Sequence, residues 1–452
     1  SFGDILTDEK ANEAAQEFIR DRIRETVKDD WRIINSRQAY QGATFSPVGA
    51  ISTENKLFVY SDRETGRSAL WQYDIASDKF DQRVFGHEKF DVNRVILNTD
   101  RTKIIGVSYF DNYLVNHFFS QQDSQLYQLV KNSFSKFQAT IYSMSKDRKQ
   151  LLISANSNNS PTKFYWLDLT NKSGGFWFSQ YPYLEKETLG ATQPYQFTTA
   201  DGMELNGYLT LPATSKVNKQ TKPSLIVFPH GGPIGPRDYQ YFDPYVQFFS
   251  QLGYAVLQVN FRGSGGFGND YLTAGYRQWG KLMQQDVYQA IDWLTEQKIV
   301  DTSNACLVGA SYGGYVALTA AFQRPERFKC IASIAGISDL LSMVKTDYKF
   351  KTNRAWLKTE IGDHTQAEVG KELHQLSAIN NLDKIKAPIL LIHGKNDTRV
   401  NYRQSADFYD EAKSAGLAVE YVEFKYGTHF LDENDNRLAA FKALESFLKQ
   451  HL

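Results

Sequence analysis

The spacing of hydrophobic residues changes near residue 190. Up to that point the apolar runs are short, aromatic and separated by clusters of Asp, Asn, Ser and Lys, which is typical of antiparallel strands and turns. After residue 200, fully apolar runs alternate with longer helical stretches, which indicates a parallel sheet covered on both faces. We therefore expect two domains, residues 1–190 and 191–452, with the boundary between Pro182 and Pro194.

Apolar segments of the first domain recur with a period of 47 residues. Segments that begin at Leu57, Ile104 and Leu151 are 47 residues apart (104 − 57 and 151 − 104), and partner segments that begin at Leu70 and Phe164 are 94 apart (164 − 70). Such a period lies in the range of four-stranded β-propeller blades. We expect a partial propeller of about four blades, with a β-sandwich of accidental spacing as the alternative.

Two stretches depart from this repeat. The nearest candidate for the middle partner segment, Leu126 to Leu129, comes about nine residues late, so we expect an insertion in that repeat. Residues 8–28 space their apolar residues as a helix does, with charges between them. We expect that helix to cover one side of the sheet domain.

The composition is typical of a folded protein and argues against some classes of binding partner. Hydrophobic residues make up 42% of the chain, and 51 basic residues balance 51 acidic ones, so no net field attracts nucleic acid or anionic lipid. No apolar run approaches the roughly 20 residues that span a bilayer. We expect a soluble protein, cytoplasmic or exported, with any signal segment outside this chain, and neither nucleic acid nor a membrane as a partner.

Neither a metal site nor a cofactor site is expected. Cys306 and Cys330 lie in apolar, strand-like stretches without CxxC spacing, which favours buried free thiols over a disulfide or a metal site. The glycine-rich run from Arg262 to Gly266 lacks the Lys-Ser/Thr pair of a phosphate loop. We interpret that run as a wall of the active site.

The segment Gly309-Ala310-Ser311-Tyr312-Gly313 has the pattern of a nucleophile elbow. It follows an apolar strand, Ala305 to Val308, and precedes a helix-forming stretch. A serine on such a turn adopts strained backbone angles, and glycines on either side remove β-carbons that would clash. We therefore predict that Ser311 is a catalytic nucleophile, with an ordinary glycine-rich turn as the alternative.

A serine nucleophile needs a base and an acid, which follow it in this fold in the order Ser, Asp or Glu, His. Asp397 lies in a loop after the strand Ile389 to Ile392, and His429 follows the strand Val419 to Phe424. Both strands end at the same edge of a parallel sheet, so we predict a triad of Ser311, Asp397 and His429. His393 is the rival base, but it adjoins its strand and the following glycine suggests a turn.

An oxyanion loop is expected after the strand Leu225 to Phe228, where His230-Gly231-Gly232-Pro233 occurs. We predict that the N–H groups of Gly232 and Tyr312 stabilise the charge that develops during acyl transfer, with an ordinary glycine turn as the alternative for the loop. Each such donor contributes about 3 to 4 kcal/mol to the transition state.

These motifs resemble those of the prolyl oligopeptidase family of serine peptidases, across essentially the whole chain. The matching segments are His230–Pro233, Phe261–Gly268, Gly309–Gly314, His393–Asp397 with Val400, and Gly427–His429. The resemblance implies an α/β-hydrolase domain with a doubly wound, mostly parallel sheet, capped by an N-terminal seven-bladed propeller. It also implies an active site that admits peptides and excludes folded proteins.

Within that family the chain is similar to the acylaminoacyl-peptidase branch. His230-Gly231-Gly232 stands where prolyl oligopeptidases proper carry an oxyanion-binding Tyr, which argues against cleavage after proline. The resemblance also implies an aromatic S1 residue shortly before Ile361, where Trp356 is the nearest candidate, with an ordinary core Trp as the alternative. Arg262, in the predicted wall, is a second candidate for substrate binding.

Three functions are compatible with the sequence. The first is a serine peptidase that hydrolyses short peptides through an acyl-enzyme, of acylaminoacyl-peptidase, oligopeptidase or dipeptidyl-peptidase type. The second is a carboxylesterase that uses the same triad. The third is a propeller-mediated binding or assembly module with an inactive hydrolase domain. Because residues 1–190 supply only about four blades, we expect a completing N-terminal segment or a homo-oligomer.

Overall fold

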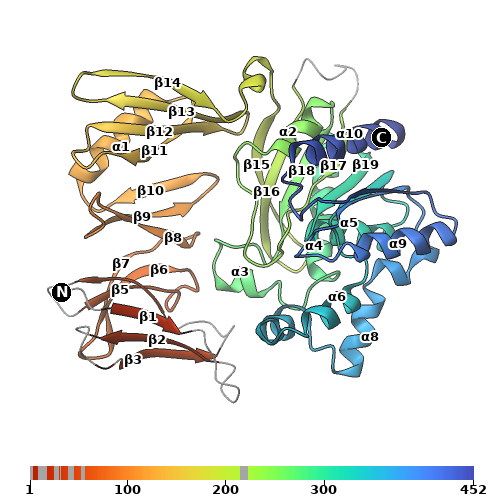
Figure 1. Cartoon of the computed structure of the whole chain (residues 1–452), viewed down its shortest axis with the longest axis horizontal. Helices are drawn as coiled ribbons and strands as arrows, with labels where there is room; N and C mark the ends of the chain where they lie inside the picture. The colour runs from red at the N-terminus through yellow and green to blue at the C-terminus, as the bar shows by residue number, and fades with distance from the viewer. Residues whose placement is uncertain are drawn as a thin grey trace. The chain divides into compact units, whose positions relative to one another are not determined.

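The computed structural model describes residues 4–8, 18–24, 30, 32–38, 45–51, 56–213 and 222–452. Within these ranges the chain forms two compact units (Figure 1). One comprises Ser1–Ser154, Tyr165–Phe176 and Gly265–Thr273, and the other comprises Ala155–Phe164, Trp177–Ser264 and Ala274–Leu452. The domain boundary at residue 190 stays a prediction.

Four small sheets succeed one another in the N-terminal part of the chain, each built from strands in sequence order. The first contains β1 (Asp4–Asp8), β2 (Phe18–Arg24) and β3 (Arg32–Gln38). The second contains β4 (Ser46–Ile51), β5 (Lys56–Ser61), β6 (Ala69–Asp74) and β7 (Lys79–Phe85). The third contains β8 (Val92–Leu97), β9 (Ile104–Phe110) and β10 (Leu114–Phe118). The fourth contains β11 (Gln138–Met144), β12 (Gln150–Ser157), β13 (Ser160–Asp168) and β14 (Ser173–Ser179).

The 47-residue period corresponds to equivalent strands of successive sheets. Leu57, Ile104 and Leu151 lie on β5, β9 and β12, which are the second strands of their sheets. Leu70 and Phe164 lie on the third strands, β6 and β13. Whether these sheets form a propeller stays a prediction.

The strand expected from Leu126 to Leu129 is wrong, because these residues belong to helix α1 (Gln121–Ser133). The Ser120 hydroxyl caps this helix by accepting the Asp123 N–H at 3.1 Å. The third strand of that sheet is β10, which comes earlier in the chain. The insertion is thus helix α1, which follows β10, the last strand of the third sheet.

The helix expected over residues 8–28 is also wrong where the structure describes it. Residues 18–24 form β2, which pairs antiparallel with β1 and β3. Strand partners on both sides satisfy the backbone groups of β2, so pairing outweighs the helical spacing of a few apolar residues. Residues 9–17 and 25–28 of the expected helix lie outside the described residues.

The second unit is built on one eight-stranded sheet of order β15-β16-β18-β17-β19-β20-β21-β22. The strands from β17 to β22 run parallel to one another. β16 pairs antiparallel with β18 on one side and with β15 on the other. These strands are β15 (Ala191–Thr198), β16 (Glu204–Leu211), β17 (Ser224–Val227), β18 (Ala255–Asn260), β19 (Asp301–Ala310), β20 (Cys330–Ile334), β21 (Ile389–Gly394) and β22 (Val419–Phe424). The sequence predicted the parallel set.

Helices come between the strands of this sheet in the sequence, and α10 follows the last strand. They are α2 (Pro244–Gln251), α4 (Leu282–Gln297), α5 (Tyr312–Gln323), α6 (Leu340–Asp347), α7 (Arg354–Trp356), α8 (Ala367–Gln375), α9 (Arg403–Ser414) and α10 (Asn434–His451), with α3 (Asn269–Thr273) in the other unit. Short helical turns occupy Pro182–Lys186, Lys351–Asn353, Leu357–Ile361, Ala378–Asn380 and Leu382–Lys384. α2 and α10 share one buried core with the parallel strands. In the described ranges, no helix combines the length and apolar character needed to cross a membrane.

The expectation of two free thiols is wrong. Cys306 on β19 and Cys330 on β20 are directly opposite in the register of two neighbouring strands, with Cα atoms 4.7 Å apart, and form a disulfide. This separation suits a disulfide, whereas the sequence positions alone do not reveal that the two residues are strand neighbours.

Candidate active site

Ser311 occupies a tight turn between β19 and α5, with a φ of 58° and a ψ of −121°. A β-carbon on Gly309 would overlap the carbonyl oxygen of Gly313, and one on Gly313 would overlap that of Pro229. The two glycines therefore allow the turn to close, as the sequence predicted. They leave the serine in a backbone conformation that non-glycine residues rarely adopt.

The structure brings Asp397 and His429 into direct contact. His429 Nδ1 lies 2.6 Å from Asp397 Oδ2, and both side chains are buried. Their loops are tied together, because the Asn396 N–H donates to the Gly427 carbonyl at 2.9 Å. Ser311, Asp397 and His429 follow β19, β21 and β22, so parallel topology brings all three to the carboxyl edge of one sheet.

The Asp397 carboxylate accepts hydrogen bonds on both oxygens. Oδ1 accepts the N–H groups of Arg399 and Val400 at 2.8 and 2.9 Å. Burial acts to raise the pKa of Asp397, but hydrogen bonds from His393, His429 and the Val400 N–H outweigh it and lower that pKa well below its ordinary value. Asp397 is therefore ionised at neutral pH.

His393, the rival base, is the last residue but one of β21 and is fully buried. Its Nε2 lies 3.2 Å from Asp397 Oδ2, on the oxygen that also contacts His429. The sequence suggested a role in a turn, and it missed this contact. The spacing of His393 and Asp397, four residues apart at the end of a strand, is the signal that was available.

The expected oxyanion loop lies beside the nucleophile. A β-carbon on Gly231 would come within 3.5 Å of Ser311 Cβ. The next residue, Gly232, has a φ of 126°, which favours glycine. Tyr312 is the first residue of α5, where backbone N–H groups have no acceptor within the helix. Tyr312 therefore adjoins Ser311 in the chain, and the loop that carries Gly232 lies beside Ser311 in space.

His230 fixes the start of this loop. Its ring stacks on Phe261 with 4.2 Å between ring centroids, and its Nε2 lies 2.9 Å from Ser264 Oγ. Burial lowers the pKa of His230 to about 4, so the ring is neutral at pH 7. His230 and Ser264 had no predicted role of their own, although both belong to the glycine-rich motifs.

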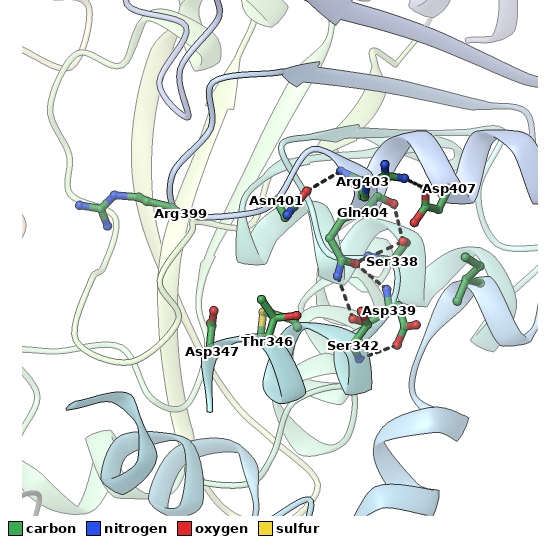
Figure 2. Close-up of a pocket in the computed structure, with 12 residues that line it drawn as sticks. Ser338, Asp339, Ser342, Thr346, Asp347, Arg399, Asn401, Arg403, Gln404 and Asp407 are labelled. Atoms are coloured by element: carbon green, nitrogen blue, oxygen red, sulfur yellow. Dashed lines mark hydrogen bonds and ion pairs between the residues drawn. The ribbon is translucent and has the colours of Figure 1, made fainter. Parts of the chain in front are cut away.

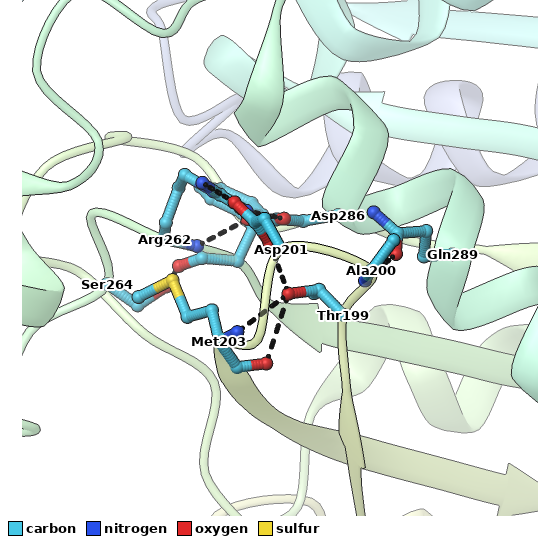
Figure 3. Close-up of polar contacts among 9 residues, drawn as sticks. Thr199, Ala200, Asp201, Met203, Arg262, Ser264, Asp286 and Gln289 are labelled. Carbon is cyan, nitrogen blue, oxygen red and sulfur yellow. Dashed lines mark hydrogen bonds and ion pairs between the residues drawn. The ribbon is translucent and has the colours of Figure 1, made fainter.

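Arg262, a predicted substrate contact, is engaged by two carboxylates (Figure 3). Its guanidinium donates to Asp286 at 2.7 and 2.8 Å and to Asp201 at 2.9 and 3.2 Å. Arg262 is 4% exposed and Asp286 is fully buried. Because two carboxylates already occupy most of its donors, Arg262 is better suited to hold its loop than to bind a ligand.

Trp356, the other predicted substrate contact, ends the short helix α7 and is half-buried. Within the described ranges, the structure gives no hydrogen bond or ring contact between Trp356 and the triad. Its role in substrate binding stays a prediction.

A polar pocket of about 170 Å³ lies next to the loop that carries Asp397 (Figure 2). Arg399, Asn401 and residues of α6 and α9 line it, whereas Ser311 and His429 are not among its lining residues. Gln404 fixes one wall by contacting the N–H groups of Ser338 and Asp339 at 2.9 and 2.7 Å. The pocket thus lies beside the Asp397 loop, and no residue of the predicted triad lines it.

Residues 240–452 match the family model described as "Prolyl oligopeptidase family". This range contains Ser311, Asp397 and His429. Over this range the chain is similar to the prolyl oligopeptidase family.

Curated proteins show the same similarity. The chain is 28% identical over 439 residues to dipeptidyl aminopeptidase BIII of Pseudoxanthomonas mexicana, covering 96% of this chain and 63% of the relative. It is 26% identical over 261 residues to the human acylamino-acid-releasing enzyme, covering 56% of this chain and 34% of the relative. The chain therefore spans less than two thirds of the length of these relatives.

Solved structures show the same fold. A puromycin-hydrolyzing peptidase of Mycobacterium tuberculosis matches 96% of this chain and 66% of its own chain, with a TM-score of 0.78 and 21% identity. An acylaminoacyl peptidase of Pyrococcus horikoshii matches 100% and 69%, with a TM-score of 0.70 and 20% identity. The likeness supports an α/β-hydrolase domain combined with an N-terminal β-rich domain.

Proposed function

We propose that this chain is a serine peptidase that hydrolyses short peptides through an acyl-enzyme on Ser311. The observation that supports this most strongly is the 2.6 Å contact between His429 and Asp397, at the sheet edge that also carries the elbow of Ser311. An ionised Asp397 orients the imidazole and stabilises the imidazolium that forms when His429 takes the proton of the serine.

The reaction follows from these roles. The Ser311 oxygen attacks the peptide carbonyl while His429 accepts its proton, and the N–H groups of Gly232 and Tyr312 stabilise the oxyanion. His429 then gives the proton to the leaving amine, which departs and leaves an ester on Ser311. A water molecule, deprotonated by His429, hydrolyses this ester and regenerates the serine. No metal or cofactor enters these steps.

The substrate class is proposed from the relatives. A dipeptidyl aminopeptidase and an acylamino-acid-releasing enzyme are both named for action at the amino end of a peptide. We propose that this chain also cleaves near that end, in a domain of residues 191–452. We further propose that the sheets of residues 1–190 form a partial β-propeller that restricts access to short peptides.

A panel of chromogenic substrates tests the proposal. It contains acetyl-aminoacyl, free-amino dipeptidyl and proline-ended nitroanilides beside simple nitrophenyl esters. We expect turnover of at least one peptide class, and loss of that turnover in Ser311→Ala by about 10⁵-fold. Ester hydrolysis without peptide hydrolysis would favour the carboxylesterase, and equal peptide turnover in the wild type and Ser311→Ala would contradict the proposal.

A further inference from the structure

The Asp397 carboxylate contacts two histidines through one oxygen. His429 Nδ1 and His393 Nε2 lie 2.6 and 3.2 Å from Oδ2. Acyl transfer, as proposed above, uses His429 alone. His393 is fully buried and has no step in that reaction, so its contact with the carboxylate requires another explanation.

The surroundings of His393 determine which nitrogen carries its proton. Nε2 lies 3.1 Å from the Val400 carbonyl oxygen, and a carbonyl can only accept a hydrogen bond. Nε2 therefore carries hydrogen and faces two acceptors, this carbonyl and Asp397 Oδ2. Nδ1 lies 2.7 Å from Ser405 Oγ, and in the neutral ring it accepts the hydroxyl proton of Ser405. The ring is thus fixed at both nitrogens.

We propose that His393 is a positioning residue for the triad, whose Nε2–H holds the Asp397 carboxylate in the rotation that His429 requires. The inference rests on the proposed function. It assigns a second effect to the same contact: a carboxylate that shares its charge with two donors attracts the proton on His429 less strongly than one with a single donor.

Neighbouring elements give His393 no competing charged partner among the described residues. On β22, Glu423 is its register partner, but Glu423 is engaged by Lys395 at 3.4 Å and by Tyr421 at 3.2 Å. On α9 the group that contacts the ring is the uncharged Ser405. On β20 the residues that share the face of His393 are the uncharged Ile331 and Ser333. Changes at His393 therefore act mainly through Asp397.

Two substitutions separate this role from simple packing. His393→Phe keeps a ring but removes the donor, and His393→Gln keeps an N–H that can reach the carboxylate. We expect His393→Phe to lower kcat about 10- to 100-fold with KM changed less than 2-fold. The acid limb of its kcat/KM profile should move to higher pH. His393→Gln should restore most of the rate and return the profile toward that of the wild type.

A variant whose activity is too low for kinetics can be tested by an NMR measurement that needs no substrate. The Nδ1 proton of His429, hydrogen-bonded to Asp397, should give a low-field proton NMR signal, and its position should move in His393→Phe. Ser405→Ala, which releases Nδ1 of His393, should move it less. Thermal unfolding shows that each variant is folded before it is compared.

The outcomes distinguish two failures. If the wild type shows turnover that depends on Ser311, and folded His393→Phe keeps its rate, pH profile and low-field signal, the positioning role is overturned while the peptidase stands. If no substrate of the panel is turned over in a Ser311-dependent way, the proposed function falls, and the inference that rests on it falls too.

Discussion

The N-terminal sheets and the eight-stranded sheet organise the chain in different ways. In the N-terminal sheets each strand pairs with its neighbours in sequence. Among the described residues, small cores join adjacent sheets, as Leu70 of β6 packs with Val92 of β8, or join a sheet to α1, as Leu151 packs with Val130. In the eight-stranded sheet the strands from β17 to β22 run parallel and are joined by helical crossovers, so the loops that carry residues 311, 397 and 429 lie at one edge. The comparison teaches that antiparallel pairing of successive strands builds local sheets, whereas parallel pairing through helical crossovers brings residues far apart in the sequence to one edge.

The largest expected effect comes from disturbing a loop at that edge. In Gly232→Ala, a β-carbon would come within 2.9 Å of Pro236 Cγ, at a φ of 126° that disfavours any side chain. The oxyanion donor must then shift, and we expect kcat to fall about 100-fold. Steady-state kinetics on the best peptide substrate measures this.

Gly202→Ala is the matched control for that experiment. Gly202 also has a positive φ, of 87°, but an added β-carbon would meet nothing within 4 Å. It should lose some stability and keep its kcat. Equal losses of kcat in both variants would show that backbone strain, and not the position of the oxyanion loop, causes the effect.

Core substitutions test whether the two regions fold separately. Leu57 on β5 and Leu225 on β17 are both fully buried. Each change to Ala should cost about 3 kcal/mol of unfolding free energy, because it leaves a cavity. Leu57→Ala should lower only an early calorimetric transition and spare ester hydrolysis below it, whereas Leu225→Ala should lower both. A single shared transition in Leu57→Ala would contradict separate cores.

Two buried carboxyls, one in each unit, differ in how their loss should change stability. Burial, with Asp243 nearby, raises the pKa of Asp238 to about 8, and its Oδ2 has no hydrogen-bond partner among the described residues. Between about pH 4 and pH 8 the unfolded chain therefore loses this proton before the folded chain does, and stability falls as pH rises. Asp238→Asn should remove this loss, so the variant should gain stability relative to the wild type as pH rises from 4 to 8, by up to about 5 kcal/mol, with little gain at pH 4.

Asp91, in the N-terminal unit, is the counterpart. Its oxygens accept the N–H groups of Ser68 at 2.7 Å and Gly268 at 3.0 Å, although burial raises its pKa. In Asp91→Asn an amide NH₂ would face one of these donors, so the change should destabilise the protein by about 1 kcal/mol at neutral pH. Denaturant titrations measure both variants, and a shared sign would contradict the assigned environments.

Sequence patterns predicted those parts of the site that depend on local rules. The elbow of Ser311 needs only a strand, two glycines and a helix, and chain order then points to Asp397 and His429. The contact between His393 and Asp397 was missed, because it depends on the orientation of a buried ring that Ser405 fixes from α9. No pattern within the strand contains that information.

Pairing between strands was predicted less well than the strands themselves. The disulfide between Cys306 and Cys330 follows from the register of β19 and β20, which no local signal specifies. In residues 18–24, partners on both sides favour a strand over the helix that the spacing suggests. The repeat of 47 residues was visible because equivalent strands of successive sheets share their apolar pattern.

Covalent labelling of Ser311 tests the central claim most directly. A fluorophosphonate reacts with a serine that has an active base and an oxyanion site, and mass spectrometry of the digested protein locates the adduct. The account predicts one adduct, on Ser311, whose formation is slowed at least 100-fold in His429→Ala. An adduct on another residue, or an unlabelled Ser311 in protein that hydrolyses the peptide panel, would contradict it.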